Sequence, residues 1–91
     1  MKERLKVTTE PVKLRFTSEP YAMFVTKQYV PVIDVHELKR QRDYYLIISP
    51  VSLSMKLNDI RLESGGALIH SEIWLHKESD EKYAKYVVEL A

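Results

Sequence analysis

The sequence predicts a small, mostly β fold with a single helix. β-Branched and aromatic residues concentrate in short runs of period two, which is the pattern of half-buried strands. One stretch, residues 50–63, instead spaces its apolar residues as a helix does. With 91 residues and no cysteine, the chain has room for one hydrophobic core and no disulfide to support it. We therefore expect a single compact domain over residues 12–91, preceded by a flexible N-terminal arm, residues 1–11, of mainly polar and charged side chains.

The first strand is expected at residues 12–17, where apolar side chains alternate with basic or polar ones. Residues 18–20, which include a proline, interrupt this pattern, and residues 22–26 resume it as a bulged or bent continuation of the same strand would. The following pair, residues 27–28, suits a tight turn.

Residues 29–35 form the next expected strand, because they are dense in β-branched and aromatic side chains. Pro31 removes one ladder donor from this strand, which indicates a sheet edge or a strand end at that position. The polar and basic segment 36–43 separates it from residues 44–48. That continuous apolar run is typical of a central strand covered on both faces.

The helix is expected to begin at Ser49-Pro50, because serine can cap free amide donors and proline is tolerated at the first helical position. Its buried face is marked by Leu53, Leu57 and Ile60. Gly65-Gly66 can end the helix with positive φ angles. Residues 50–63 also alternate as a strand would, so a strand stays open as the alternative.

The C-terminal part predicts two further strands. Residues 67–76 alternate along their length, and a charged loop follows at 77–81. The last segment, 80–91, fits both a helix and a strand. Its β-prone centre, Tyr86-Val87-Val88, favours the strand.

The resulting order is three strands, a helix and two strands. This is the order of a small five-stranded OB-like barrel with one helix between strands 3 and 4, so that fold is our prediction. The alternative is a two-layer α+β domain, in which two helices cover one face of an antiparallel sheet.

Charge and hydropathy argue against several classes of protein. The chain has 14 Lys and Arg against 13 Asp and Glu, whereas a dedicated duplex-DNA binder is usually strongly basic. No apolar run approaches the roughly 20 residues of a membrane span. No secretion signal is recognisable, so we expect a cytoplasmic protein. Abundant Glu and Lys, a single asparagine (Asn58) and no cysteine are typical of a thermophilic source.

No sequence motif indicates catalysis. The serines lack a Gly-x-Ser-x-Gly elbow, and Gly65-Gly66 lacks the pattern of a phosphate-binding loop. His70, Glu72 and His76 would share one strand face, but the two histidines would lie about 20 Å apart at the rise of a strand. We therefore expect no enzymatic activity, no metal site and no small-molecule cofactor.

Aromatic and basic residues give the best functional lead, because single-strand binders stack bases on aromatic rings and follow the backbone with cations. The residues expected to contact nucleic acid are Lys13, Arg15, Lys27, Tyr29, Lys39, Arg40, Arg42 and Tyr44. The residues expected to dock on a protein are Trp74, Tyr83, Leu5 and Val7.

These residues predict a non-enzymatic accessory subunit of a larger nucleic-acid-processing complex. It would dock on a larger protein of nucleic-acid metabolism and contact single-stranded DNA or RNA weakly. A near-neutral chain without motifs fits a subunit better than a free-standing catalyst. The alternative is a self-sufficient single-stranded nucleic-acid-binding OB-like protein.

Overall fold

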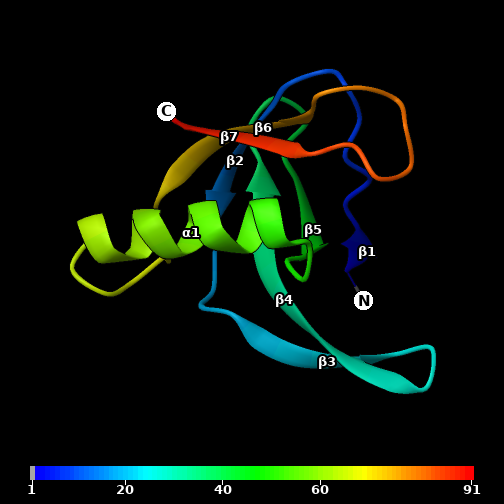
Figure 1. Ribbon diagram of the computed structural model, residues 1–91. Coiled ribbons are helices and arrows are strands. Elements are labelled where there is room, and N and C mark those ends of the chain that lie inside the picture. Colours follow the sequence, from blue (N-terminus) through cyan, green and yellow to red (C-terminus); the bar gives the residue numbers. More distant parts are fainter. Residues whose placement is uncertain (1) are drawn as a thin grey trace.

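The computed structural model describes residues 2–91 and has a mostly β fold, with 43% of the chain in strands and 14% in a helix. The elements are β1 (Glu3–Arg4), β2 (Val12–Phe16), β3 (Tyr21–Val25), β4 (Gln28–Glu37), β5 (Arg42–Ile47), α1 (Val51–Glu63), β6 (Glu72–Lys77) and β7 (Tyr86–Leu90). The strands form one sheet in the order β1-β5-β4-β2-β6-β7, and β3 pairs with β4 beside this path (Figure 1).

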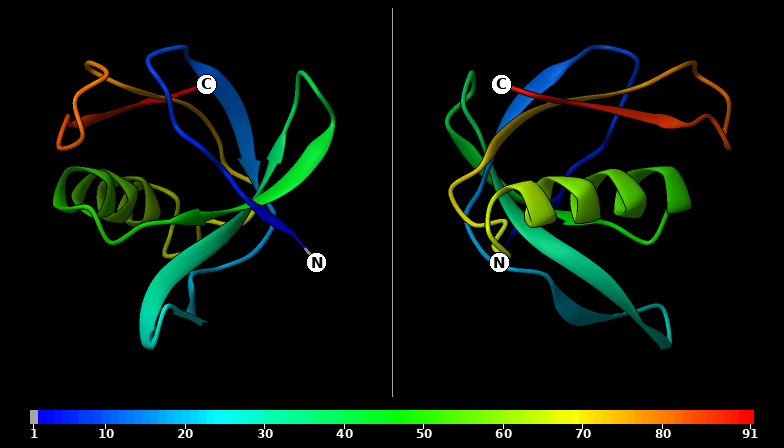
Figure 2. Two further views of the ribbon diagram at one scale, coloured as in Figure 1. Left: turned by 90° about the vertical axis from the view of Figure 1, so that its right-hand side faces the viewer. Right: turned by 60° about the vertical axis from the view of Figure 1, so that its left-hand side comes forward.

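The hydrophobic core lies between the curved sheet and α1 (Figure 2). Leu14 and Phe16 of β2 point into it and are fully buried, whereas Lys13 and Arg15 point outward, as the period of two predicts. The helix contributes Leu53, Leu57 and Ile60. The predicted helix and its buried face are therefore confirmed.

The N-terminal end of α1 differs from the prediction. Pro50 is the N-cap residue, and no side chain caps this end, so the expected Ser49 cap is wrong. The carbonyl of Pro50 accepts the first helical hydrogen bond from the Ser54 N–H at 2.9 Å. Because proline has no N–H to satisfy, it fits this position without a capping partner of its own.

The C-terminal end of α1 is formed as predicted. Gly65 and Gly66 have φ angles of +79° and +103°, and the Gly66 N–H donates to the Arg61 carbonyl at 2.8 Å. The helix follows β5 rather than the third strand, because the structure has two additional strands before it. β1 lies in the segment that was expected to be a flexible arm, and β3 was expected to continue the first strand. Residues 2–91 contain one helix, so the alternative fold with two helices is wrong. That helix is neither long nor apolar enough to cross a membrane.

The sheet is open between its end strands, β1 and β7, so the expected OB-like barrel is not formed. The edge of β5 that faces away from β4 pairs in parallel with β1. Just beyond β1, the Leu5 N–H donates to the Tyr45 carbonyl at 2.8 Å. Farther along the chain, the Thr8 carbonyl accepts a bond from the Lys77 N–H at 2.8 Å. The N-terminal segment thus bridges β5 and β6 across the opening (Figure 2).

β3 is a separate strand and not the bent continuation of β2 that the sequence suggested. It forms a hairpin with β4 that projects from the body of the domain (Figure 1). The turn is at Thr26 and Lys27, one residue earlier than predicted, with φ angles of +46° and +67°. Two successive positive φ angles give the tight turn whose twist matches that of paired strands.

β4 is a central strand and not an edge strand, although the expected interruption of pairing at Pro31 is present. It is ten residues long and pairs with β2, β3 and β5. Pro31 is tolerated because the ladder between β4 and β5 ends there, with the Ile48 N–H donating to the Pro31 carbonyl at 3.0 Å.

The two C-terminal strands pair antiparallel with each other. β6 begins at Glu72 rather than at residue 67, because residues 68–71 form a turn in which His70 has a φ of +75° and the Ser71 N–H donates to the Leu68 carbonyl. Residues Tyr86–Leu90 form β7, so the preference for a strand over a helix in this segment is confirmed.

Candidate functional site

A row of charged side chains crosses the outer face of the sheet. The strand register places Glu72, Arg15, His36 and Asp43 beside one another on β6, β2, β4 and β5. The Arg15 guanidinium donates to Glu72 Oε2 from Nε at 3.1 Å and from Nη2 at 2.9 Å. A carboxylate stands at each end of this charged row, with Arg15 and His36 between them. Arg15 is already neutralised by the carboxylate of Glu72, so it presents a weaker field to a phosphate than an unpaired arginine would.

The hydrogen-bond partners of His36 favour its protonated form. Its Nδ1 lies 2.8 Å from Asp43 Oδ1, and its Nε2 lies 3.0 Å from Gln41 Oε1. The side-chain amide of Gln41 is itself oriented by a hydrogen bond, because its own Nε2 donates to the Leu38 carbonyl at 2.7 Å. Both ring nitrogens therefore face acceptors, and only the protonated ring donates from both. The hydrogen bond to Asp43, followed by that to Gln41, raises the pKa of His36 above its ordinary value.

Trp74 lies beside this row, in a hollow at the end of the sheet. The indole is 41% exposed, and Lys13 Nζ lies 6.0 Å from its ring centroid and 3.8 Å from a Glu72 carboxylate oxygen. The hollow, which we call the Trp74 pocket, has a volume of about 160 Å³. It is lined by Glu10, Pro11, Val12, Lys13, Glu37, Lys39, Arg40 and Trp74.

Three segments meet at the Trp74 pocket. The turn between β4 and β5 brings Lys39 and Arg40, and the Leu38 N–H donates to the Lys13 carbonyl at 3.1 Å, which fixes that turn against β2. Arg40 lies 3.8 Å from the buried carboxylate of Glu37. Within residues 2–91, Lys39 forms no ion pair within 4.0 Å. The pocket therefore combines the face of an indole ring with cationic side chains. The ring suits a flat or apolar group, and the cations suit a negative charge next to that group.

The structure separates the residues predicted to contact nucleic acid. Lys13, Lys39 and Arg40 meet at the Trp74 pocket, and Arg42 begins β5 next to it. Arg15 belongs to the charged row.

The other predicted nucleic-acid contacts lie elsewhere. Lys27 and Tyr29 are in the β3–β4 hairpin, at the opposite end of a ten-residue strand that spans roughly 30 Å. Tyr44 is 9% exposed and belongs to the core, because its side chain alternates inward on β5. It is not available to stack a base, which corrects that part of the prediction.

The predicted docking residues do not form one surface either. Leu5 is buried in the core, and Val7 is partly buried and packs against it. Tyr83 is 88% exposed in the loop between β6 and β7, where it lines a hollow with the start of α1 rather than with Trp74. Trp74 is thus the docking candidate that the fold places beside predicted cations.

Sequence reasoning missed Phe24. Its side chain is 61% exposed, and its ring centroid lies 5.1 Å from that of Tyr29, which is 73% exposed. The two rings are tilted by 54° and occupy opposite positions of the β3–β4 hairpin. A hairpin turn placed at residues 26–27 would have revealed this pair, but Thr26 gives no sequence signal for a positive φ.

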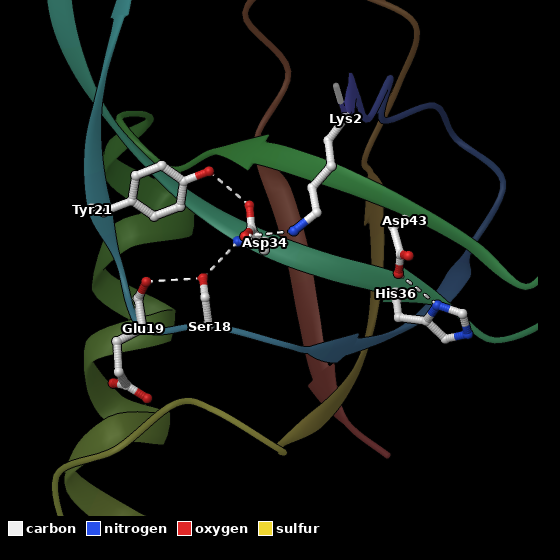
Figure 3. A network of polar contacts seen from close by, with 7 residues as sticks. All are labelled: Lys2, Ser18, Glu19, Tyr21, Asp34, His36 and Asp43. Atoms are coloured by element: carbon white, nitrogen blue, oxygen red, sulfur yellow. Dashed lines mark hydrogen bonds and ion pairs between the residues drawn. The ribbon is translucent and has the colours of Figure 1, made fainter.

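Asp34 forms a second polar cluster near the N-terminus (Figure 3). Its carboxylate accepts hydrogen bonds from Lys2 Nζ and from the Tyr21 hydroxyl, each at 2.7 Å, and its N–H donates to Ser18 Oγ at 3.0 Å. Partial burial opposes ionisation of Asp34, but the bonds from Lys2 and Tyr21 outweigh it and lower the pKa of Asp34. The bond to Asp34, with burial second, raises the pKa of Tyr21 to about 12.

Neither cluster resembles a metal centre. Residues 2–91 contain no group of three or more His, Asp or Glu side chains arranged to hold a metal ion. His70 lies in the turn before β6, so it does not share the strand face of Glu72 and His76 that the sequence suggested.

Comparison of the chain with models of protein families, with curated proteins and with solved structures found no match.

Proposed function

We propose that the protein is a non-enzymatic accessory subunit of a larger nucleic-acid-processing complex. In this proposal it docks on a protein partner through the Trp74 pocket and contacts nucleic acid weakly through the cations around that pocket. The observation that carries the proposal is the meeting of Trp74 with Lys13, Lys39 and Arg40 in one hollow.

Protein docking is favoured by the form of the pocket. A half-exposed indole in a concave site is a common anchor of protein interfaces, because it buries a large area with few rotatable bonds. Three cations and two carboxylates line the pocket, so its local charge is positive. A partner segment with an apolar or aromatic side chain flanked by acidic residues fits this chemistry.

Weak rather than strong nucleic-acid contact follows from the ion pairs. Glu72 neutralises Arg15 and lies near Lys13, and Glu37 lies near Arg40. Among the cations in and next to the pocket, Lys39 and Arg42 form no ion pair within residues 2–91, so these two are left to contact a phosphate backbone. Affinity for a nucleic acid rises with the number of phosphates neutralised, so this small number predicts weak, salt-sensitive binding.

A self-sufficient single-strand binder is the second candidate. It is favoured by the same indole, on which a base would stack for about 1 to 3 kcal/mol. The ~30 Å between the pocket and the aromatic residues of the β3–β4 hairpin opposes it, because these groups do not form one continuous path for a short strand.

The first experiment uses Trp74 as an intrinsic probe, since it is the only tryptophan in the chain. Its fluorescence is followed while a short oligothymidylate is added at several salt concentrations. The proposal predicts weak quenching that salt abolishes. In the variant Lys39→Glu with Arg42→Glu, the salt slope falls by about 1.4, because each single-strand phosphate contact contributes ~0.7.

The matched control reverses two cations outside the pocket, Lys56→Glu with Lys82→Glu, and leaves the slope unchanged. Tight quenching that persists at high salt supports the self-sufficient binder instead. Absence of quenching at low salt contradicts any contact of nucleic acid with the Trp74 pocket.

The docking half of the proposal is tested by affinity capture from the native extract, with nuclease present. We expect one larger protein in fixed ratio. Trp74→Ala then weakens the purified complex at least ~30-fold, or about 2 kcal/mol, as for an interface anchor. Tyr83→Ala, which removes another exposed aromatic side chain, is the control and leaves the complex intact. Capture that disappears with nuclease contradicts the docking assignment.

A further inference from the structure

The outer edge of β3 is an uncovered sheet edge. Among the helices and strands, β3 packs only against β4, so its other side faces solvent. Its sequence, Tyr21–Val25, contains no charged residue and no proline. Proteins usually protect such an edge with lysine, proline or a bulge, and an edge without these devices pairs readily with another strand.

The hairpin geometry identifies the unpaired backbone groups. Val25 and Gln28 flank the two-residue turn, so they form the hydrogen-bonded pair that closes the hairpin. Hydrogen-bonded positions alternate along an antiparallel ladder, so Met23 and Tyr21 also bond to β4. The N–H and C=O groups of Ala22 and Phe24 therefore point away from β4. In residues 2–91 they take part in no turn, loop or cap bond.

This edge is complementary to itself. In an antiparallel pair of two β3 strands with the two-fold axis at Met23, Ala22 of one copy faces Phe24 of the other. Each such pair exchanges both backbone hydrogen bonds, so every outward group of both copies is satisfied.

Shifted registers of the same β3–β3 pair satisfy fewer backbone hydrogen bonds. Shifting the axis to Ala22 pairs Phe24 with Pro20, which has no N–H. Shifting it to Phe24 pairs Ala22 with Thr26, which lies in the turn.

Side chains and charges favour the same arrangement. The large Phe24 ring lies next to the small Ala22 of the second copy, on the face where Phe24 already meets Tyr29. Glu19 precedes β3 and Lys27 follows it. Antiparallel pairing brings the acidic end of each strand to the basic end of the other, whereas parallel pairing would bring like charges together.

We propose that the protein forms a symmetric dimer by antiparallel pairing of β3 with β3 of a second copy, centred on Met23. The pairing joins the two hairpins into one four-stranded sheet and places Ala22 of the second copy beside Phe24. It does not rest on the Trp74 pocket, which lies at the other end of β4. The contact is small compared with standard interfaces, so the dimer is concentration-dependent.

The test begins with sedimentation equilibrium of the full chain over about 5 to 500 µM, a range that brackets weak interfaces. We expect a shift from monomer to dimer. Phe24→Lys places a charge on the edge and weakens the dimer at least about tenfold. Leu62→Lys, which makes the same kind of change at an exposed position of α1, leaves the dimer unchanged. A chain that stays monomeric throughout, or a dimer indifferent to Phe24→Lys, overturns the proposal.

A cysteine variant tests the register directly, because the chain has no cysteine of its own. In the proposed register Met23 faces Met23 of the second copy at a non-hydrogen-bonded position, with Cα atoms about 4.5 Å apart, close enough for a disulfide. Met23→Cys is therefore expected to cross-link rapidly with a mild oxidant, and Met55→Cys on α1 is not. Equal rates for the two variants overturn the proposed register even if Phe24→Lys fails to fold.

Discussion

Glu19 holds the segment that follows α1 against the body of the domain, and its removal gives a sharp test of how that segment is stabilised. Its carboxylate accepts bonds from the Leu68 N–H at 3.0 and 3.1 Å and from the Ile69 N–H at 2.6 Å. Leu68 is buried in the core. The substitution Glu19→Ala removes the acceptor and leaves the Leu68 N–H next to the core without a partner.

The expected loss follows from these bonds. A buried donor without a partner costs about 1 to 3 kcal/mol, and bonds to a charged group lie in a similar range. Glu19 itself is exposed, so water recovers part of this loss and the lower half of the range applies. We expect the free energy of unfolding to fall by about 1 to 2 kcal/mol. For a domain of this size, the melting temperature falls by about 4 to 8 °C per kcal/mol.

The assay is urea unfolding at neutral pH, followed by circular dichroism. Glu78→Ala is the control, because it removes an exposed glutamate from the loop between β6 and β7. A surface change of that kind stays within about 0.5 kcal/mol. If Glu19→Ala costs no more than Glu78→Ala, the carboxylate does not stabilise this segment and the reasoning is refuted.

The pH dependence gives a second check of the same contact. The bonds from Ile69 and then Leu68 lower the pKa of Glu19 below its ordinary value of 4.5. A lowered pKa means that the stabilisation is fully present above the unfolded-state value and is lost as pH falls through the folded-state value. The difference between the natural chain and Glu19→Ala therefore shrinks on acidification below about pH 4.5. A difference that stays constant to about pH 3 contradicts the charged contact.

Two further titrations follow from the polar clusters. The raised pKa of His36 means that its bonds to Asp43 and Gln41 stabilise the fold fully below the ordinary value of 6.5 and less as pH rises through the folded-state value. Urea unfolding should therefore show the advantage of the natural chain over His36→Asn decreasing as pH rises above 6.5, and an advantage that grows there would contradict the raised pKa of His36. Tyr21 titrates near pH 12, so Tyr21→Phe removes a phenolate absorbance step there, and Asp34→Asn moves the step to lower pH.

The parts of the fold that burial dictates could be predicted from sequence. Leu14 and Phe16 alternate with basic residues because one side of β2 must face the core, and the helical spacing of α1 has the same cause. The prediction that β3 continues the preceding strand was wrong because the side chains of β3 are mostly exposed. Without a buried face, the sequence of this strand has no clear alternation of apolar and polar residues. The turn at Thr26 was missed because a β-branched residue rarely adopts a positive φ.

Individual residues of the candidate site could be predicted from sequence, but the sequence did not indicate which of them lie next to one another. Trp74 and Lys39 were both expected to bind partners, but their meeting depends on the bond from the Leu38 N–H to the Lys13 carbonyl, which joins two distant segments. The error at Tyr44 has a simpler origin. Two adjacent tyrosines on a strand face opposite sides, and only the register decides which of them is buried.

The pairing of β2 with β6 also affects how this chain folds during synthesis. Arg15 and Glu72, which are neighbours across these strands, lie 57 positions apart in the chain. At about 5 to 20 residues per second, translation needs roughly 3 to 11 s to pass from one to the other. During that interval Leu14 and Phe16 lack the strand that covers them on one side. A nascent chain in this state has one edge of β2 that is not yet paired, and this edge stays open to pairing with other strands until β6 is synthesised.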